Sequence, residues 1–321
     1  MLNEFKVFGF LRKDMSRLEG YLEKFTDSLD GILKEGVENT LLAGGKRIRS
    51  ALFFICARNT GYDIAYLLPA AASIEIIHTA SLIHDDIIDK SELRRGKKTI
   101  HSLYDNDTAK YIGNYLFTHT FSLLNTYRNP EILREMSSAA EYLVRGEFDQ
   151  LNKHKTLDQD ENFYFSMISK KTSSLFKGSC ALGGLLSGAG RKETKKLSEF
   201  GRLLGIAFQI NDDLLDVDKS MSRNIGKPVG NDIRQGNITL PIIYALKDKK
   251  AKKHLEKVLG EDDLSNDDIR EALELINSTD AVDVAKAKLT AYSGRARKMA
   301  SAIGEAERRK NLLKVCDYFK T

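Results

Sequence analysis

The chain has 321 residues, and its 50 Lys and Arg against 45 Asp and Glu give a net charge of +5. Hydrophobic residues make up 42% and charged residues 30%, a composition typical of a soluble globular protein. So mild a charge, with no basic stripe interleaved with aromatic residues, gives no argument for nucleic-acid binding. With only 4 Pro and no Trp, a β-sandwich or barrel built on frequent turns is also disfavoured.

The cysteines and the most apolar stretch indicate a cytoplasmic protein. Cys56, Cys180 and Cys316 are widely spaced and include no CxxC pair, so we expect reduced and mostly buried thiols. The first residues lack the charged and apolar regions of a signal peptide. The segment 64–84 is the nearest match to a membrane span, but it carries Glu75, so we expect a buried helix and no stable membrane insertion.

Apolar residues recur at helical spacing along most of the chain. Across 11–35 they lie three or four positions apart. The same period recurs in further segments: 66–90, 110–127, 131–151, 161–187, 193–218, 237–247, 267–276 and 281–303. No fixed repeat and no low-complexity linker divides the chain. We therefore predict an all-α fold, a single large domain over 1–321 with roughly ten or more helices.

Two DDxxD motifs, at 85–89 and 212–216, lie in segments rich in Ile and Leu. Positions i and i+4 share a helix face, so the first and last Asp of each motif project together. Like charges one turn apart repel, and carboxylates on apolar helices are costly to desolvate. Mg²⁺ removes both problems, because it binds a few carboxylates together with phosphate oxygens. A single motif would indicate a solvated helix end, whereas two favour a metal site.

Basic residues supply groups that suit a diphosphate. A Gly pair precedes three cations in GGKRIR at 44–49, at the predicted start of a helix, where backbone N–H groups also favour anions. Arg binds phosphate through two parallel hydrogen bonds, whereas Lys acts as a point charge. Further basic residues lie in the pairs Arg94-Arg95, Lys171-Thr172 and Gly226-Lys227. Each pair alone would indicate a solvated face, but beside two acidic motifs they favour an anion site.

From about 44 to 246 the chain resembles the trans-isoprenyl (polyprenyl) diphosphate synthases. The resemblance rests on seven blocks in order: GGKRIRS (44–50), EIIHTASLIHDDIID (75–89), LRRGK (93–97), GEFDQL (146–151), KKTSSLF (170–176), GIAFQINDDLLD (205–216) and GKPVGNDIRQGNITLP (226–241). It implies a ring of helices around a deep central cavity, a homodimer, and Mg²⁺, about three ions with substrate bound. It also implies isopentenyl diphosphate and an allylic prenyl diphosphate as substrates. The expected reaction ionises the allylic diphosphate, condenses the resulting cation with isopentenyl diphosphate and eliminates a proton.

The resemblance assigns roles to individual residues. The metal ligands would be Asp85, Asp89 and Asp212, with Asp86, Asp213 and Asp216 in supporting or water-mediated roles. The allylic diphosphate would be held by Arg94, Lys171 and Lys227. The diphosphate of isopentenyl diphosphate would be bound by Lys46, Arg49, His78 and Arg95. The allylic cation would be stabilised by the Gln209 amide oxygen and the Lys171–Thr172 backbone. The Gly- and Asn-rich segment 219–236 would close the site against water.

Product length is expected to depend on the helix before Asp85. Ile77, Ala80 and Ser81 lie one to two turns below Asp85, and in the family an aromatic residue at the two nearest positions stops the product early. Ala80 and Ser81 are small, which predicts a medium- to long-chain product of about C25–C40. The alternatives are a C20 or C15 synthase. Phe117 and Phe121 are either a plug or ordinary core aromatics.

Other readings remain open at this stage. The chain is either a complete synthase or the catalytic subunit of a heteromeric one. An HD-type metal phosphohydrolase would leave 212–216 and GGKRIR unexplained. A class I terpene cyclase would need Ser and Glu where Leu215 and Lys219 stand. Two departures from the family are Asn114, where Asp is common, and Ser50, where Pro is usual.

Overall fold

The computed structural model describes residues 9–218, 229–261 and 264–317. The elements in chain order are η1 (Gly9–Leu11), α2 (Arg12–Asp27), α3 (Gly31–Leu41), α4 (Ile48–Ala57), α5 (Ile64–Ile88), β1 (Leu93–Arg94), β2 (Lys97–Lys98), α6 (Ile100–Leu103), α7 (Asn106–Asn125), α8 (Pro130–Asn152), α9 (Glu161–Lys171), α10 (Ser173–Leu186), α11 (Arg191–Val217), α13 (Asn231–Gln235), α14 (Leu240–Ala245), α15 (Lys249–Leu259), α16 (Asn266–Ser278), α17 (Ala281–Ser301) and α18 (Ala306–Cys316). The all-α prediction is confirmed.

Asp side chains cap the first turns of several helices. The Asp63 carboxylate accepts the Ala65 backbone N–H over 2.9 Å at the start of α5. Asp105 and Asp160 cap α7 and α9 in the same way. Each cap satisfies a backbone donor that has no partner inside the helix, which stabilises the helix by about 1 kcal/mol.

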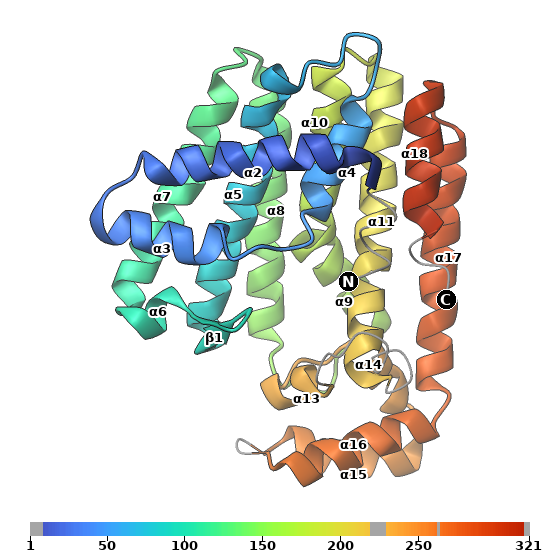
Figure 1. The fold of residues 1–321 in the computed structure, drawn as a ribbon. Coiled ribbons are helices and arrows are strands. Elements are labelled where there is room, and N and C mark those ends of the chain that lie inside the picture. Colours follow the sequence, from blue (N-terminus) through green and yellow to red (C-terminus); the bar gives the residue numbers. More distant parts are fainter. Residues whose placement is uncertain (1–8, 219–228, 262–263, 318–321) are drawn as a thin grey trace.

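The two helices that carry the acidic motifs run through the interior. α5 is apolar on nearly every side and packs against α2, α4 and α7. α11 packs against α10 and α17. Figure 1 shows α5 and α11 ending near the same end of the molecule, α5 beside β1 and α11 beside α13 and α14. Both acidic motifs therefore lie at one end of the helical bundle.

Two predicted helices are each split in the structure. The segment 11–35 contains α2 and α3, separated at 28–30, and Gly31 begins α3 with a φ of +54° that favours glycine. The segment 161–187 contains α9 and α10, which meet at Thr172. There the hydroxyls of Thr172 and Ser173 hydrogen bond to α11, so contacts with a neighbouring helix replace a continuous helical path.

A short hairpin follows the first acidic motif. Leu93 pairs with Lys98 and Arg94 with Lys97 in an antiparallel register. The two residues between them, Arg95 and Gly96, have φ values of +53° and +78°, as a two-residue hairpin turn with both φ angles positive requires. The RRG sequence thus forms a tight hairpin turn, which fixes the backbone positions of Arg94 and Arg95.

Candidate active site

Most of the predicted site residues line one cavity of about 440 Å³. Its wall is built from the loop before α4 and from α4, α5, the β1–β2 hairpin, α8, α9 and α11. The predicted residues that it brings together are Lys46, Arg49, His78, Ser81, Asp85, Arg94, Arg95, Lys171, Thr172, Gln209 and Asp212. One cavity therefore contains an acidic side formed by both motifs and a basic side formed by the GGKRIR and RRG segments.

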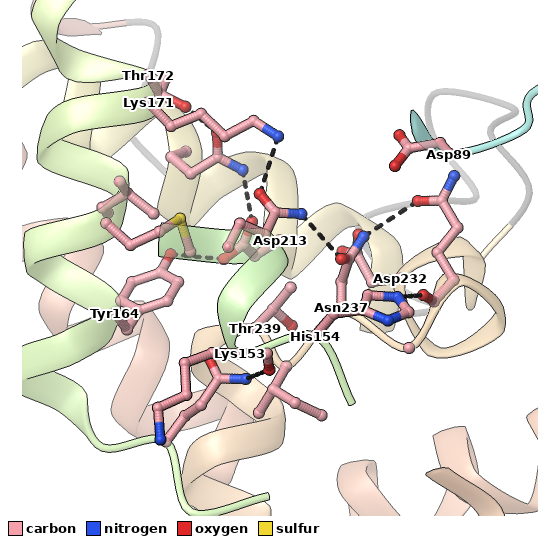
Figure 2. A pocket seen from close by; sticks show the side chains of 18 residues that line it. Asp89, Lys153, His154, Tyr164, Lys171, Thr172, Asp213, Asp232, Asn237 and Thr239 are labelled. Atoms are coloured by element: carbon pink, nitrogen blue, oxygen red, sulfur yellow. Dashed lines mark hydrogen bonds between the residues drawn. The ribbon is translucent and has the colours of Figure 1, made fainter. Parts of the chain in front are cut away.

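A second, smaller cavity of about 170 Å³ is shown in Figure 2 with the side chains that line it. Lys171, Thr172 and Gln209 line both cavities. The second cavity adds Asp89 and Asp213 from the acidic motifs, together with residues of 232–239. Lys227 and 219–228 of the predicted lid lie outside the described residues, whereas 229–236 closes one wall of this smaller cavity.

Asp85 and Lys171 are a partly buried acid and a partly buried base that line the same cavity. Burial raises the pKa of Asp85 to about 7 against the opposing effect of Lys171, and Glu147 and Asp89 raise it further. Burial lowers the pKa of Lys171, but the charges of Asp85 and Glu147 outweigh this effect and the net pKa is raised. Lys171 is thus a permanent cation. Asp85 lacks the compensation that a fully ionised buried carboxylate requires.

The donor set of the acidic motifs fits a hard divalent cation. All candidate ligands are carboxylates, and burial, with smaller contributions from Glu147 and Asp89, raises the pKa of Asp85. Within the described residues, no three His, Cys, Asp or Glu side chains lie close enough to hold a metal ion by themselves. A cation between the two motifs would therefore need further oxygen ligands, and water or a diphosphate supplies them.

Lys171 is held in place by two residues of α8. Its Nζ donates to Glu147 Oε1 over 2.7 Å and to Gln150 Oε1 over 2.8 Å. The two helices approach closely because residue 146 is Gly: a Cβ there would lie 2.2 Å from the Lys171 backbone nitrogen. Gly146 of the GEFDQL block thus lets α9 pack closely against α8. Glu147 of the same block supplies a negative charge for Lys171, the last residue of α9.

Gln209 is oriented by hydrogen bonds at both ends of its amide. The Thr172 hydroxyl donates to Gln209 Oε1 over 2.6 Å, and Gln209 Nε2 donates to Asp213 Oδ1 over 2.8 Å. The Tyr164 hydroxyl donates to the other oxygen of Asp213 over 2.5 Å. Burial raises the pKa of Asp213 to about 7, although both hydrogen bonds oppose the shift. Asp213 therefore fixes the orientation of the Gln209 amide by accepting a hydrogen bond from its nitrogen.

Two further Asp residues are engaged by neighbouring groups. Arg94 Nε donates to Asp86 Oδ1 over 2.8 Å, and Asp86 is buried outside the walls of both cavities. The Asp216 carboxylate accepts backbone N–H groups of Asn231 and Asp232 over 3.0 and 2.8 Å. Asp86 thus positions Arg94 in this structure, and Asp216 ties the second motif to α13.

The basic side of the cavity contains a paired Arg49 and His78. Arg49 Nη1 lies 3.2 Å from His78 Nε2, and its guanidinium lies 4.8 Å from the centre of the Phe176 ring. Burial and the charge of Arg49 hold the pKa of His78 well below its ordinary value, so the neutral ring accepts the Arg49 hydrogen bond. Burial lowers the pKa of Arg49 to about 10. The pair presents one positive charge in a weakly hydrated wall.

Neighbouring residues hold the GGKRIR loop in shape. Arg47 lines the larger cavity but is buried, and its guanidinium is engaged by Glu19 and Glu75, with Nη1 3.1 Å from Glu75 Oε2. The Ser50 hydroxyl donates to the other oxygen of Glu75 over 2.5 Å, which gives this departure from the family a structural role. A Cβ at Gly45 would lie 2.9 Å from Arg95, so this glycine admits the Arg95 guanidinium.

The comparisons with known proteins agree with this geometry. The family model described as "Polyprenyl synthetase" matches residues 30–276, more than half of the chain. The chain belongs to the polyprenyl synthetase family. It is 37% identical over 277 residues to heptaprenyl diphosphate synthase component 2 of Geobacillus stearothermophilus, which is 86% of each chain. It is 33% identical over 279 residues to a short chain isoprenyl diphosphate synthase of Methanocaldococcus jannaschii, 84% of each chain.

A solved structure of the same family overlays nearly the whole chain. It is a polyprenyl synthase from Caulobacter crescentus complexed with calcium and isoprenyl diphosphate, with a TM-score of 0.90 and 28% identity over 98% of this chain and 97% of that one. Membership of this family makes the protein a prenyltransferase enzyme, as its motifs predicted.

For this polyprenyl synthetase, three residues were predicted to set product length, and one of them lines the larger cavity. Ser81 lines the wall, whereas Ile77 and Ala80 are fully buried in the core and outside the described wall. Phe117 stacks on His84 with ring centres 5.8 Å apart, and neither Phe117 nor Phe121 lines a cavity. Both aromatic residues are partly buried and pack against the core.

Several residues of the site were missed by motif reading. Glu147, Gln150, Tyr164, Asp232 and Asn237 all line one of the cavities. Glu147 and Gln150 stood in the quoted GEFDQL block, and Asp232 and Asn237 in GKPVGNDIRQGNITLP, so a signal for their importance was present. Tyr164 had none, because a lone Tyr in an apolar helix is typical of a core residue.

Proposed function

We propose that this polyprenyl synthetase condenses isopentenyl diphosphate with an allylic diphosphate by ionisation, condensation and elimination. The observation that carries the proposal is the single cavity with carboxylates of both motifs on one side and Lys46, Arg49 and Arg95 on the other. Two diphosphates need two anion sites, and an ionising diphosphate needs a dry cavity with fixed charges. The cavity brings acidic and basic side chains together in one place, and closure over substrate would exclude water.

The metal of this proposal is Mg²⁺, held by Asp85, Asp89, Asp212 and Asp216, with Asp86 and Asp213 in support. When bound, a divalent cation offsets the negative charge of the leaving diphosphate. The family structure complexed with calcium and isoprenyl diphosphate supports a divalent cation at such a site. We propose about three ions with substrate bound, since diphosphate oxygens and water complete the ligand sets.

The chain's own residues would orient the substrates and stabilise charge. Lys171 and Arg94, with Lys227, would bind the leaving diphosphate, and Lys171 already faces Asp85. The Gln209 amide oxygen, fixed by Thr172, would face the positive charge left on the allylic carbon. Loss of a proton from the condensed product completes the reaction, with the departed diphosphate as the acceptor.

The second diphosphate would lie against the basic wall. Arg49 supplies a fork of donors, and its buried Nε has no hydrogen-bond partner within the described part of the chain. His78 is neutral and fixes the Arg49 guanidinium by accepting from it. Lys46, from the loop before α4, and Arg95, from the β1–β2 turn, line the same cavity and complete this set. We propose that these four residues bind isopentenyl diphosphate without a metal.

The proposed product is a medium- to long-chain all-trans polyprenyl diphosphate of about C25–C40. The small Ser81 in the cavity wall supports a long product, as does the similarity to a heptaprenyl synthase component. The similarity to a short-chain synthase supports the C20 or C15 alternative. Product analysis after incubation with farnesyl diphosphate, isopentenyl diphosphate and Mg²⁺ decides between them: products that stop at C15 or C20 exclude the long-chain assignment.

We propose that two copies of the chain form a homodimer through α7 and α8. Val144, Phe148 and Leu151 lie at i, i+4 and i+7 on α8 and are 41%, 60% and 39% exposed, and Tyr111 of α7 is 74% exposed. An apolar stripe of this kind is costly in water unless it is covered. Sedimentation of the purified chain tests the proposal: a dimer that Phe148→Asp converts to monomer supports it, and a wild-type monomer contradicts it.

The named relative "component 2" supports a second candidate assembly. In that candidate the chain is the catalytic subunit of a heteromeric synthase, because both of its acidic motifs are intact. Assays of the purified chain alone and with a second subunit separate the two assemblies. Full activity alone supports the homodimer, and activity only on mixing supports the heteromer.

We also propose that the chain is one cytoplasmic domain. One described helix, α5, is long and apolar enough to cross a membrane, but 78% of its most apolar window is buried inside the protein. Such burial is typical of the central helix of a soluble fold. Fractionation of cells that express the chain tests this: recovery in the soluble fraction without detergent is expected.

A further inference from the structure

A continuous run of side-chain hydrogen bonds joins Lys171 to the segment between α13 and α14. Lys171 Nζ donates to Gln150 Oε1 over 2.8 Å, and Gln150 Nε2 donates to Asn237 Oδ1 over 2.9 Å. Asn237 Nδ2 then donates to Gln235 Oε1 over 3.1 Å. The dashed lines between Lys171 and Asn237 can be followed across the cavity in Figure 2.

The direction of this run is set by the charge at its start. A Lys ammonium has donors only, so Gln150 must turn its oxygen towards Lys171. Its nitrogen then faces Asn237, which must present its own oxygen and turn its nitrogen to Gln235. Each amide orientation therefore depends on the previous one, and a change at either end disturbs the other.

Other contacts bind the same segment to the rest of the site. The Asp216 carboxylate accepts two backbone N–H groups at the start of α13. At its end, His154 Nε2 lies 2.6 Å from Gln235 O, and the Lys155 N–H donates to Gly236 O over 3.2 Å. The segment 230–237 is thus attached to the second acidic motif on one side and to the end of α8 and the residues after it on the other.

Glu147 alone does not explain the position of Lys171. It supplies an opposite charge, with Oε1 2.7 Å from Lys171 Nζ. A charge attracts from many directions, whereas two acceptors on different side chains select one position of the ammonium group. Gln150 is the second acceptor, and its own position depends on Asn237.

We infer that Gln150 and Asn237 are positioning residues that couple the diphosphate-binding Lys171 to segment 230–237. The inference rests on the proposed function, because the role of Lys171 comes from it. The pair holds the ammonium group towards Asp85 when the segment is docked on the site. Loss of either amide breaks the hydrogen-bonded link between the segment and the ammonium group, which are then held only by their other contacts.

A double-mutant cycle tests the coupling. The variants are Gln150→Ala, Asn237→Ala and the double substitution, with affinity for inorganic diphosphate in Mg²⁺ measured by calorimetry, and kcat and KM for farnesyl diphosphate measured in parallel. Each single change is expected to weaken diphosphate binding about tenfold. The double change should also weaken it about tenfold, not by the roughly hundredfold product expected of independent residues.

A control amide lies outside this run of hydrogen bonds. Asn39 of α3 donates from Nδ2 to the backbone oxygen of Lys98 over 2.7 Å, and neither residue lines either cavity. Asn39→Ala should therefore leave the effect of Asn237→Ala on diphosphate binding unchanged. Multiplying effects for Gln150 and Asn237 would overturn the inference, and so would coupling that is seen in the free energy of unfolding but not in diphosphate affinity. Coupled diphosphate binding without condensation by the wild type would instead refute the proposed function and retain the inference.

Discussion

Gly146 of α8 lies directly against the backbone of Lys171 in α9, so close that a Cβ would stand 2.2 Å from the Lys171 nitrogen. Backbone atoms cannot rotate away as a flexible side chain does, so any larger residue must separate the two helices. The residues that follow Gly146 on α8, Glu147 and Gln150, bind the Lys171 ammonium group. A single glycine thus controls both helix packing and the position of a site cation.

We predict that Gly146→Ala destabilises the protein and reduces its activity. Overpacking at this contact should lower the free energy of unfolding by about 1–3 kcal/mol, and displacement of Lys171 should lower kcat. Urea unfolding and steady-state kinetics measure the two effects. Gly20→Ala in α2 is the matched control, because nothing lies within 4 Å of its added Cβ. Equal behaviour of the two variants would contradict the close contact.

The two adjacent Asp residues of the second motif should respond differently to substitution. Asp212 lines the larger cavity, whereas Asp213 accepts hydrogen bonds from Tyr164 and Gln209. Asp212→Asn should lower kcat at least about 100-fold and raise the Mg²⁺ concentration needed for activity, with little change in stability. Asp213→Asn should chiefly lower the thermal midpoint, because a carboxamide can accept only one of the two hydrogen bonds well.

Titrations of activity with Mg²⁺ and thermal melts without metal measure the two responses. Chelation of divalent cations should abolish condensation by the wild type and leave its helical circular dichroism unchanged. If both variants show the same Mg²⁺ response and the same melting behaviour, the assignment of different roles is wrong.

Acid should destabilise the fold through His78. Burial and Arg49 hold the pKa of His78 well below 6.5 in the folded state. As the pH falls below about 6.5, the unfolded chain binds a proton at His78 that the folded chain does not bind, so the free energy of unfolding decreases. Above that pH the contribution is fully present. Urea unfolding between pH 5 and 8 should show this loss, and His78→Gln should reduce its slope.

Thr79→Ser provides the control for this measurement. Thr79 is the buried neighbour of His78 on α5, and its side chain does not ionise between pH 5 and 8. Its substitution should lower the free energy of unfolding by the same amount at every pH. A His78→Gln slope equal to the wild-type slope would show that other groups cause the acid sensitivity.

Helix periodicity and two motifs gave much of the fold and the centre of the site. The period failed at α4, where nine of ten residues are buried, because a helix covered on every side has no polar face to mark its turns. The period also predicted one continuous helix over 161–187, whereas contacts with α11 break this helix at Thr172. Within the site, the pairing of Gln150 with Asn237 joins residues 87 positions apart, and no local pattern encodes such a contact.

Ser81 and Ala80 should differ as determinants of product length. Ser81 lines the cavity, and Ala80 is fully buried beside it in the core. Ser81→Phe should place a ring in the cavity and shorten the product, with a fold that remains intact. Ala80→Phe should instead overpack α5 and destabilise the protein by about 1–3 kcal/mol. Product chromatography and urea unfolding of both variants measure these effects. An unchanged product from a folded Ser81→Phe variant would place the growing chain along a different wall.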